Sequence, residues 1–293
     1  MSSALLLLAA LAFSDADAER TLEEAREFVT DCTPRDAGTP EGRRAADWIA
    51  ARASALGVPT VTDVFSAPAP GGVRSFANVY VRFTRSVTAP WTVLVSHFDT
   101  KPGTDCPGAN DGASTTALLL SLCRVIRDDR AFKGNVLLVW TDAEECRGAH
   151  YTETDGLQGS RRAAAELKRR GLSVAAVYVL DMLGDGDLGI TLPANIAPEL
   201  IPAVRQAAAL AGLPAELLEE TRLHVRDDHV PFLEAGFPAA VLIDFSYGTE
   251  PGLNDLWHTP RDTPERLSAA SLKQSGALAA ELLNLSVSAD RPR

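Results

Sequence analysis

Short apolar runs that alternate with longer helical patterns constrain the fold of this chain more than any other feature. The runs lie at 92–96, 135–140, 174–180 and 239–243, and they consist mainly of Val, Leu, Ile and Ala. Continuous runs of this length are typical of strands buried on both faces. Strands that alternate with helices indicate a mostly parallel sheet covered by helices. We therefore expect an α/β fold, a three-layer α/β/α sandwich with a mostly parallel central sheet.

The remaining patterns complete this expectation. Thr39 and Pro40 are typical of a helix start, and that helix is expected to run through Leu56 and end at Gly57. An alternating strand is expected at 76–83, after a Pro-rich connection at 58–70. Further helices are expected at 112–128, 160–170, 197–211 and 269–285. No linker interrupts the pattern, so residues 19–293 are expected to form one catalytic domain.

Composition narrows the classes of function. The chain has 293 residues, with 28 Lys and Arg against 39 Asp and Glu, and a formal net charge of -11. Such an acidic chain is a poor candidate for binding nucleic acid or anionic membranes. It fits a soluble enzyme whose carboxylates hold cations. No stretch of sequence is long and apolar enough to predict a membrane span.

The beginning of the chain has two interpretations. Residues 4–13 are apolar, and Ala16-Asp17-Ala18 resembles a signal-peptide cleavage site, which predicts a signal peptide at 1–18 and an exported protein. No Lys or Arg precedes Arg20, although signal peptides usually start with a positive charge. The alternative is a buried N-terminal helix that continues through residues 21–29.

The four cysteines are also open to two interpretations. Cys32, Cys106, Cys123 and Cys146 form an even set without a C-x-x-C spacing. The spacing argues against a cysteine zinc site. An even number is consistent with disulfides in an exported protein, and the alternative is four buried thiols.

Acidic and imidazole side chains follow the carboxyl ends of the expected strands, where ligands of such sheets bind. They are His97 and Asp99, Asp111, Glu144 and Glu145, Asp181, and His258. Imidazole and carboxylate groups are typical zinc ligands. Several carboxylates in one cleft repel each other unless a cation is present. The sequence therefore predicts a zinc site in this cleft.

Spacing within the pairs suggests separate roles. His97 and Asp99 are two residues apart, so on an extended chain they point the same way, and Asp99 can hydrogen-bond the imidazole of His97. Glu144 and Glu145 are adjacent and face different ways. One can bind metal while the other carries protons.

Several motifs together resemble metallopeptidase family 28, which contains zinc aminopeptidases and animal-type glutaminyl-peptide cyclotransferases. They are Pro-Arg-x-x-Gly-Thr-Pro at 34–40, His-x-Asp at 97–99, Gly-Ala-Asn-Asp-Gly-Ala-Ser at 108–114, Glu-Glu at 144–145, Asp-Met-Leu-Gly at 181–184 and Trp-His-Thr-Pro-x-Asp-Thr at 257–263. The resemblance implies that Asp111, Glu145 and His258 hold the catalytic zinc. In dinuclear aminopeptidases, His97 and Asp181 complete a second zinc site, with Asp111 bridging. Asp99 is expected to orient His97, and Glu144 to act as general acid and base.

Three features resemble the cyclotransferase branch: the long insertion at 146–157, the Asp-Asp-His-x-Pro-Phe motif at 227–232, and Trp257 before the last ligand. Gly-Ala-Ser at 112–114 resembles the peptidases, and His150 or Tyr151 stands where cyclotransferases carry a pocket Trp. We expect a cyclotransferase that binds one zinc and converts N-terminal Gln of peptides to pyroglutamate. One alternative is a two-zinc aminopeptidase. A non-catalytic binding ectodomain is a remote alternative, because relatives of that kind generally lack several metal ligands and this chain lacks none.

The cyclotransferase interpretation also assigns residues around the metal. Trp257, Tyr151 and Asp181 are expected to line the substrate pocket. Asp181 and Asp228 are expected to share a hydrogen-bond network with Glu144. Alternatively, Asp228 caps a short helix at 229–234, Trp257 packs against the loop that carries His258, and Tyr151 is an ordinary loop residue.

Overall fold

The computed structural model describes residues 10–250 and 253–288. In this part of the chain, eight strands form one sheet in the order β1-β2-β4-β3-β5-β8-β6-β7. The strands are β1 (Thr60–Ala69), β2 (Gly72–Phe83), β3 (Trp91–His97), β4 (Asn135–Thr141), β5 (Val174–Asp181), β6 (Ile190–Leu192), β7 (Leu218–Glu220) and β8 (Ala239–Ile243). Neighbouring strands among the central β4, β3, β5 and β8 are parallel. The two edges include antiparallel pairs, so the expected mostly parallel sheet is confirmed.

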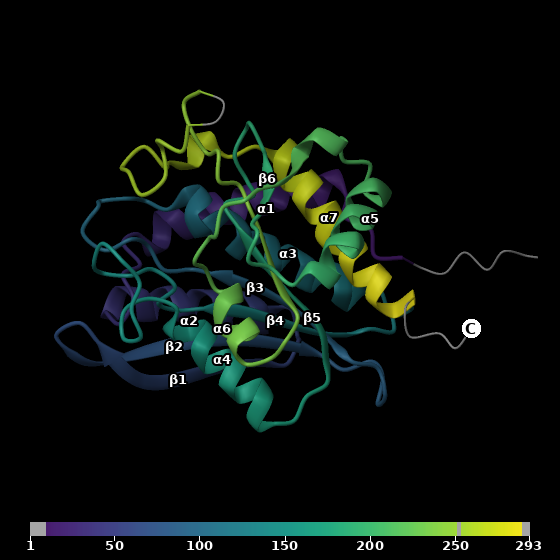
Figure 1. Ribbon diagram of the computed structural model, residues 1–293, viewed down its shortest axis with the longest axis horizontal. Coiled ribbons are helices and arrows are strands. Elements are labelled where there is room, and N and C mark those ends of the chain that lie inside the picture. Colours follow the sequence, from purple (N-terminus) through teal and green to yellow (C-terminus); the bar gives the residue numbers. More distant parts are fainter. Residues whose placement is uncertain (1–9, 251–252, 289–293) are drawn as a thin grey trace, which may run out of the picture.

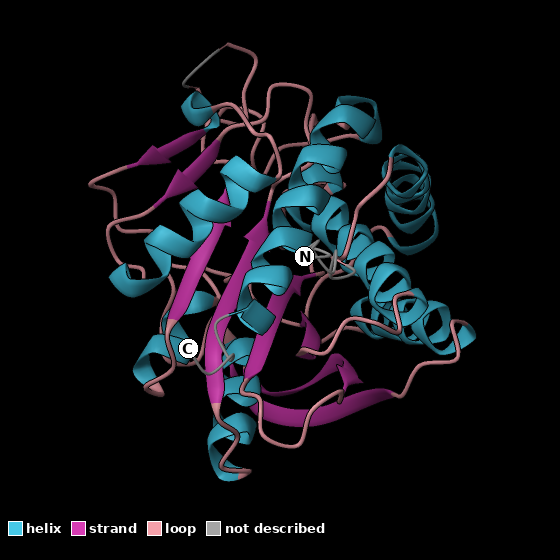
Figure 2. Cartoon of the chain, turned by 90° about the vertical axis from the view of Figure 1, so that its right-hand side faces the viewer, coloured by secondary structure: helices cyan, strands magenta, loops and turns pink. Residues whose placement is uncertain are grey.

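Helices flank the sheet (Figures 1 and 2). They are α1 (Asp15–Cys32), α2 (Pro40–Ala55), α3 (Thr115–Asp128), α4 (Gln158–Arg169), α5 (Ile201–Leu210), α6 (His229–Glu234) and α7 (Ala269–Ser288). Helices α1, α3 and α7 contact each other, and α5 contacts α7. Helix α4 contacts α6. One large apolar core joins both helical layers to the central strands, which confirms the three-layer expectation.

Besides the short strands β6 and β7, which were not expected, two segments differ from the sequence-based expectation. Residues 58–70, expected as a connection, contain the edge strand β1, which pairs with β2 alone. Its side chains are mostly half-buried or exposed and it contains Pro68, which a sheet tolerates at an edge. The helix expected from residue 112 begins at Thr115, because residues Ala109–Ser114 form a π-turn with non-helical backbone at Asp111 and Gly112.

The N-terminal segment packs into the domain. Residues 4–9 of the apolar start lie outside the described residues. Ser14 caps α1 through a capping box, and Ala16–Ala18 lie inside that helix. Leu11 and Phe13 are 2% and 5% exposed. The described part matches the alternative N-terminal helix, and the boundary expected after Ala18 falls within α1.

The four cysteines are free and buried, so the disulfide interpretation is wrong and the buried-thiol alternative is confirmed. Burial raises the pKa of the Cys32 thiol to about 11 and that of Cys123 to about 12. No helix in the described part of the chain is long and apolar enough to cross a membrane.

Candidate metal centre and active site

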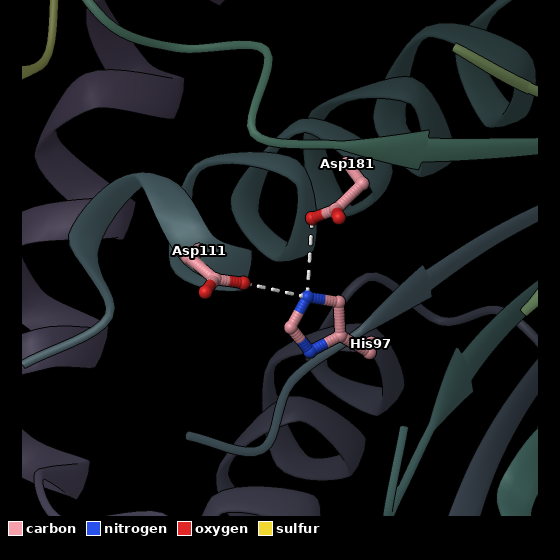
Figure 3. A group of neighbouring side chains, drawn as sticks. All are labelled: His97, Asp111 and Asp181. Carbon is pink, nitrogen blue, oxygen red and sulfur yellow. Dashed lines mark hydrogen bonds and ion pairs between the residues drawn. The ribbon is translucent and has the colours of Figure 1, made fainter. Parts of the chain in front are cut away.

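The first group of candidate metal ligands joins three segments at the carboxyl edge of the sheet. His97 ends β3, Asp181 ends β5, and Asp111 lies in the π-turn before α3. The Nε2 atom of His97 lies 3.0 Å from Oδ1 of Asp111 and 3.1 Å from Oδ1 of Asp181 (Figure 3). All three side chains are buried. Parallel strands that end together thus bring these residues into one group, as the sequence predicts.

The second group shares Asp111 with the first and adds Glu145 and His258. The Nε2 atom of His258 lies 2.7 Å from Oε1 of Glu145 and 3.4 Å from Oδ2 of Asp111. Oδ1 of Asp111 faces His97, while its Oδ2 faces His258. The carboxylate of Asp111 therefore stands between two possible metal positions.

The chemistry of both groups fits a divalent metal. In each group, the ligand atoms lie within 4.8 Å of one another. Oε2 of Glu145 is buried without a hydrogen-bond partner, and burial together with Asp111 raises the pKa of Glu145 to about 7. Nζ of Lys101 lies 3.6 Å from this Oε2 atom. A bound cation would relieve this crowding of carboxylates, and imidazole with carboxylate oxygen is a donor set that zinc accepts.

Glu144 lies in the same cleft as Glu145 but has a different partner. The hydroxyl of Tyr151 donates to Oε1 of Glu144 over 2.9 Å. Burial and the neighbouring Glu145 raise the pKa of Glu144 well above its ordinary value. Ala143 has a left-handed backbone, with φ of 57°, where the chain turns out of β4 toward these glutamates. One glutamate thus faces the metal ligands and the other faces Tyr151.

Asp99 contributes differently from the expectation. Its Oδ1 lies 3.7 Å from Nδ1 of His97, which is beyond hydrogen-bond distance, and Nδ1 has no hydrogen-bond partner. The two oxygens of Asp99 instead accept from the backbone N–H groups of Glu144 and Glu145, each over 3.1 Å. Asp99 therefore fixes the backbone of the two glutamates and lies beside the His97 ring.

A small cleft opens onto these groups. Asp111, Glu144, Glu145, Asp181 and His258 line it, and so do Tyr151, Val225, Arg226, Asp227, Ile243, Phe245 and Trp257. The indole of Trp257 stacks on the His258 ring, with centroids 3.8 Å apart. The structure thus places Trp257, Tyr151 and Asp181 in the cleft.

The two adjacent aspartates before α6 divide differently from the expectation. Asp227 lines the cleft, and its Oδ2 is buried without a partner. Asp228 is not among the residues that line the cleft, and its Oδ2 accepts from the Thr141 hydroxyl over 2.5 Å. Its side chain forms no capping hydrogen bond to α6 either. Sequence reasoning chose Asp228, since nothing in an Asp-Asp pair indicates which side chain faces the cleft.

Asp262 is a second residue that the sequence reasoning left without a role. It is fully buried and accepts from the backbone N–H groups of Asn110 over 2.8 Å and Asp111 over 3.2 Å. The Tyr247 hydroxyl also donates to it over 2.8 Å. Asp262 therefore positions the turn that carries the shared ligand. Its place four residues after His258, within the Trp-His-Thr-Pro motif, was the available signal.

Arg35 is the third such residue. Its guanidinium is fully buried and donates to the carbonyls of Phe98 over 2.7 Å, Pro107 over 2.9 Å and Gly108 over 2.8 Å. The guanidinium also lies 4.9 Å from the Phe28 ring centroid. Arg35 thus joins both ends of the loop between His97 and Asp111. The Pro-Arg pair at 34–35 was visible in the sequence, but its contacts were not.

The fold is an α/β sandwich, and two candidate metal positions that share the Asp111 carboxylate lie at the carboxyl edge of its sheet. This combination is typical of a class of metalloenzymes. Residues 78–283 match Peptidase family M28. The chain belongs to this family, which confirms the resemblance seen in its motifs.

Solved structures and curated relatives agree with this assignment. A glutaminyl cyclase from an Acidobacteriales bacterium is 30% identical, with a TM-score of 0.85 over 98% of this chain and 99% of that one. Aminopeptidase YwaD of Bacillus subtilis is 29% identical over 68% of this chain, and the match spans 42% of that protein. Glutaminyl-peptide cyclotransferase of Bos taurus is 26% identical over 78% of this chain and 69% of its own length.

Proposed function

We propose that this protein is a zinc-dependent glutaminyl-peptide cyclotransferase, which converts N-terminal Gln of a peptide to pyroglutamate and releases ammonia. The match to the bacterial glutaminyl cyclase carries this proposal, because it extends over nearly the whole of both chains. The match to the Bacillus aminopeptidase spans less than half of that protein. A leucine aminopeptidase precursor from Bacteroides thetaiotaomicron is 21% identical, so its similarity supports the fold alone.

Asp111, Glu145 and His258 would hold the catalytic zinc. Bound there, zinc supplies Lewis-acid polarisation of the substrate carbonyl. Oε2 of Glu145, which has no hydrogen-bond partner, supports this assignment. His97 and Asp181 complete a second position around Asp111, which a one-zinc cyclotransferase leaves without a metal.

The substrate supplies its own nucleophile. The peptide's α-amine nitrogen bonds to the side-chain carbonyl carbon of the same Gln, and the bond from that carbon to the amide nitrogen breaks. Because both groups belong to one residue, the cleft mainly has to hold Gln folded back on itself. The aromatic ring of Trp257, which lies over His258, is placed to restrict the Gln side chain.

Glu144 is the residue best placed to move the proton. It would accept a proton from the attacking amine and deliver it to the departing ammonia. Its carboxylate lines the cleft, and the Tyr151 hydroxyl holds Oε1 in place. Asp181 and Asp227 line the same cleft and complete the acidic wall around Glu144. Asp228 would support this wall from behind, through Thr141.

A metallo-aminopeptidase is the second candidate. The specific observation in its favour is that both candidate metal groups are complete and share Asp111. In this function two zinc ions are bound, and Glu144 takes a proton from the attacking water before the N-terminal residue is cleaved off. We also propose that the protein is exported. The support for export is the apolar start of the chain, which resembles a signal peptide.

Ammonia release from Gln peptides tests the proposal when it is measured beside hydrolysis of aminoacyl anilides. We expect ammonia release that depends on zinc, about one zinc per chain, and little anilide cleavage. Anilide cleavage with two zincs per chain and no ammonia release would assign the aminopeptidase function instead. Asp111→Asn is the matched control and should lose both zinc and activity.

A further inference from the structure

The cleft carries one positive charge that the reaction does not use. Among the described residues that line it, Arg226 is the only Arg or Lys, beside five carboxylates. The Arg226 side chain is exposed and, within the described part of the chain, forms no hydrogen bond or ion pair. In a chain of net charge -11, an unpaired guanidinium at an acidic cleft is available to a ligand.

The backbone around Arg226 holds its side chain toward the outside. Val225 and Asp227 on either side are 8% and 2% exposed, so the chain alternates between buried and exposed side chains here. The side-chain amide of Asn195 bonds the Val225 backbone twice, over 3.0 Å to its N–H and over 2.7 Å to its carbonyl. The backbone next to Arg226 is therefore held in place before a substrate arrives, so only the side chain has to be ordered on binding.

The carboxylates of the cleft are not available to neutralise Arg226. The side chains of Glu144, Glu145 and Asp181 bond to Tyr151, His258 and His97, respectively. Asp227 is adjacent in sequence but buried, whereas Arg226 is exposed, and no ion pair joins the two side chains in the described part of the chain. Arg222 and His224 are also exposed and precede Arg226 on the same segment. The nearest exposed acidic residue in sequence that forms no hydrogen bond or ion pair with the described residues is Glu219.

We propose that Arg226 determines substrate specificity, by binding an acidic side chain at the second position of the substrate peptide. This inference rests on the proposed function, because the first residue of the peptide must lie at the metal ligands. An extended peptide advances about 3.3 Å per residue, so the following residues pass the mouth of the cleft. Guanidinium and carboxylate match in geometry as well as charge.

The test compares the peptide amides Gln-Glu-Ala, Gln-Gln-Ala and Gln-Lys-Ala. For the zinc-loaded wild type, kcat/KM should be highest for Gln-Glu-Ala, intermediate for Gln-Gln-Ala and lowest for Gln-Lys-Ala. Each difference should be about twofold to fivefold, which corresponds to the energy of an exposed ion pair. The difference should appear in KM and should shrink at high salt, because salt screens exposed charges. Equal kcat/KM values for the three peptides would overturn the proposal.

Variants assign the preference to this side chain. Arg226→Gln should bring the Glu-to-Lys ratio near one, Arg226→Glu should invert it, and Arg226→Lys should retain part of it. Arg130→Gln is the matched control, because Arg130 is exposed in the loop before β4, at the opposite edge of the sheet, and its loss changes the net charge equally. A ratio that survives Arg226→Gln, or that falls equally in Arg130→Gln, contradicts the proposal.

Measurements of peptide binding distinguish a failure of this inference from a failure of the proposed function. Calorimetry with the Glu144→Gln variant and the same peptides should show the same order of Kd values. If no peptide is cyclised but Gln-Glu-Ala binds more tightly in an Arg226-dependent manner, the proposed function fails and the inference about Arg226 stands. If peptides are cyclised without any contrast in Kd or KM, the inference fails and the proposed function stands.

Discussion

At the scale of single residues, the candidate metal centre depends on carboxylates whose two oxygens contact two different groups. Asp111 faces His97 with one oxygen and His258 with the other, while Asp262 holds its backbone N–H. Asp99 likewise uses both oxygens, for the backbone of Glu144 and Glu145. Because each of these residues fixes two others, small changes here should affect the whole centre.

Glu144→Gln separates proton transfer from metal binding. The substitution keeps the size of the side chain and the Tyr151 contact but removes the proton acceptor, so kcat should fall by a factor of about 100 or more. Zinc content measured by atomic absorption should stay at the wild-type value. Glu153→Gln, in the exposed part of the same loop, should retain activity. If Glu144→Gln also retains activity, Glu144 is not the proton carrier.

The sequence could predict which residues meet at this centre but not their contacts. Five strand ends or loops with His, Asp or Glu indicated which side chains lie close together, because parallel strands end at one edge. The choice of Asp228 over Asp227, and the expected bond from Asp99 to His97, both depended on side-chain direction in irregular loops. Periodicity indicates direction within a strand or helix but not beyond its end.

At the scale of elements, buried polar contacts hold the loops that carry the ligands. Arg35 joins the segment after β3 to the turn before α3. Gly108 in this turn has φ of +63°, and a Cβ there would come within 2.6 Å of the Arg35 guanidinium. Such contacts connect residues 63 to 73 positions apart, so sequence patterns could not reveal them. The edge strand β1 was expected as a connection for a different reason, because its segment is Pro-rich and lacks a continuous apolar run, although it pairs with the adjacent β2.

Arg35→Met should destabilise the protein and loosen the metal centre. Three buried carbonyls would lose a charged donor, so we expect a loss of about 3 kcal/mol or more in the free energy of unfolding. Denaturant unfolding measures this loss, and competition with a chelator measures zinc affinity. Arg44→Met, on the exposed face of α2, should change stability by less than about 1 kcal/mol. Equal effects of the two substitutions would contradict a special role for Arg35.

Residues 11–13 should contribute to the stability of the domain. Leu11 exchanges two backbone hydrogen bonds with the Asn284 side chain, and a Cβ on Gly276 would come within 2.4 Å of the Phe13 ring. A chain that begins at residue 19 should therefore unfold at lower denaturant concentration than one that begins at residue 10, by about 2 kcal/mol or more. Equal midpoints would show that this segment is dispensable and would favour a domain boundary at residue 18.

At the scale of the whole molecule, five of the 39 Asp and Glu side chains meet in one cleft at the carboxyl edge of the sheet. His258 lines the cleft with them, and the ends of the central strands, the turn before α3 and the segment before α6 bring them there. A cation bound between these carboxylates would compensate their charges and allow the fold to keep the cluster buried. The composition alone suggested cation binding, whereas the arrangement of ligands required the fold.

Removal of metal should therefore lower the melting temperature. At a zinc concentration about 100 times Kd, binding stabilises the folded state by about 2.7 kcal/mol, which corresponds to a shift in Tm of roughly 5 °C or more. Calorimetry before and after chelation and zinc addition measures this shift. Asp111→Asn should melt at the same temperature with and without zinc. If the Tm of the wild type is the same with and without zinc, the proposed metal centre is contradicted.

The most direct test of the central claim is mass spectrometry of one peptide with N-terminal Gln, incubated with the zinc-loaded protein. Both candidate reactions then compete for the same substrate. The account predicts a product that has lost one ammonia, with formation that stops when the chelator is added and in Glu144→Gln. A product that has lost the whole Gln residue would contradict the proposed cyclotransferase function and assign the protein to the aminopeptidases.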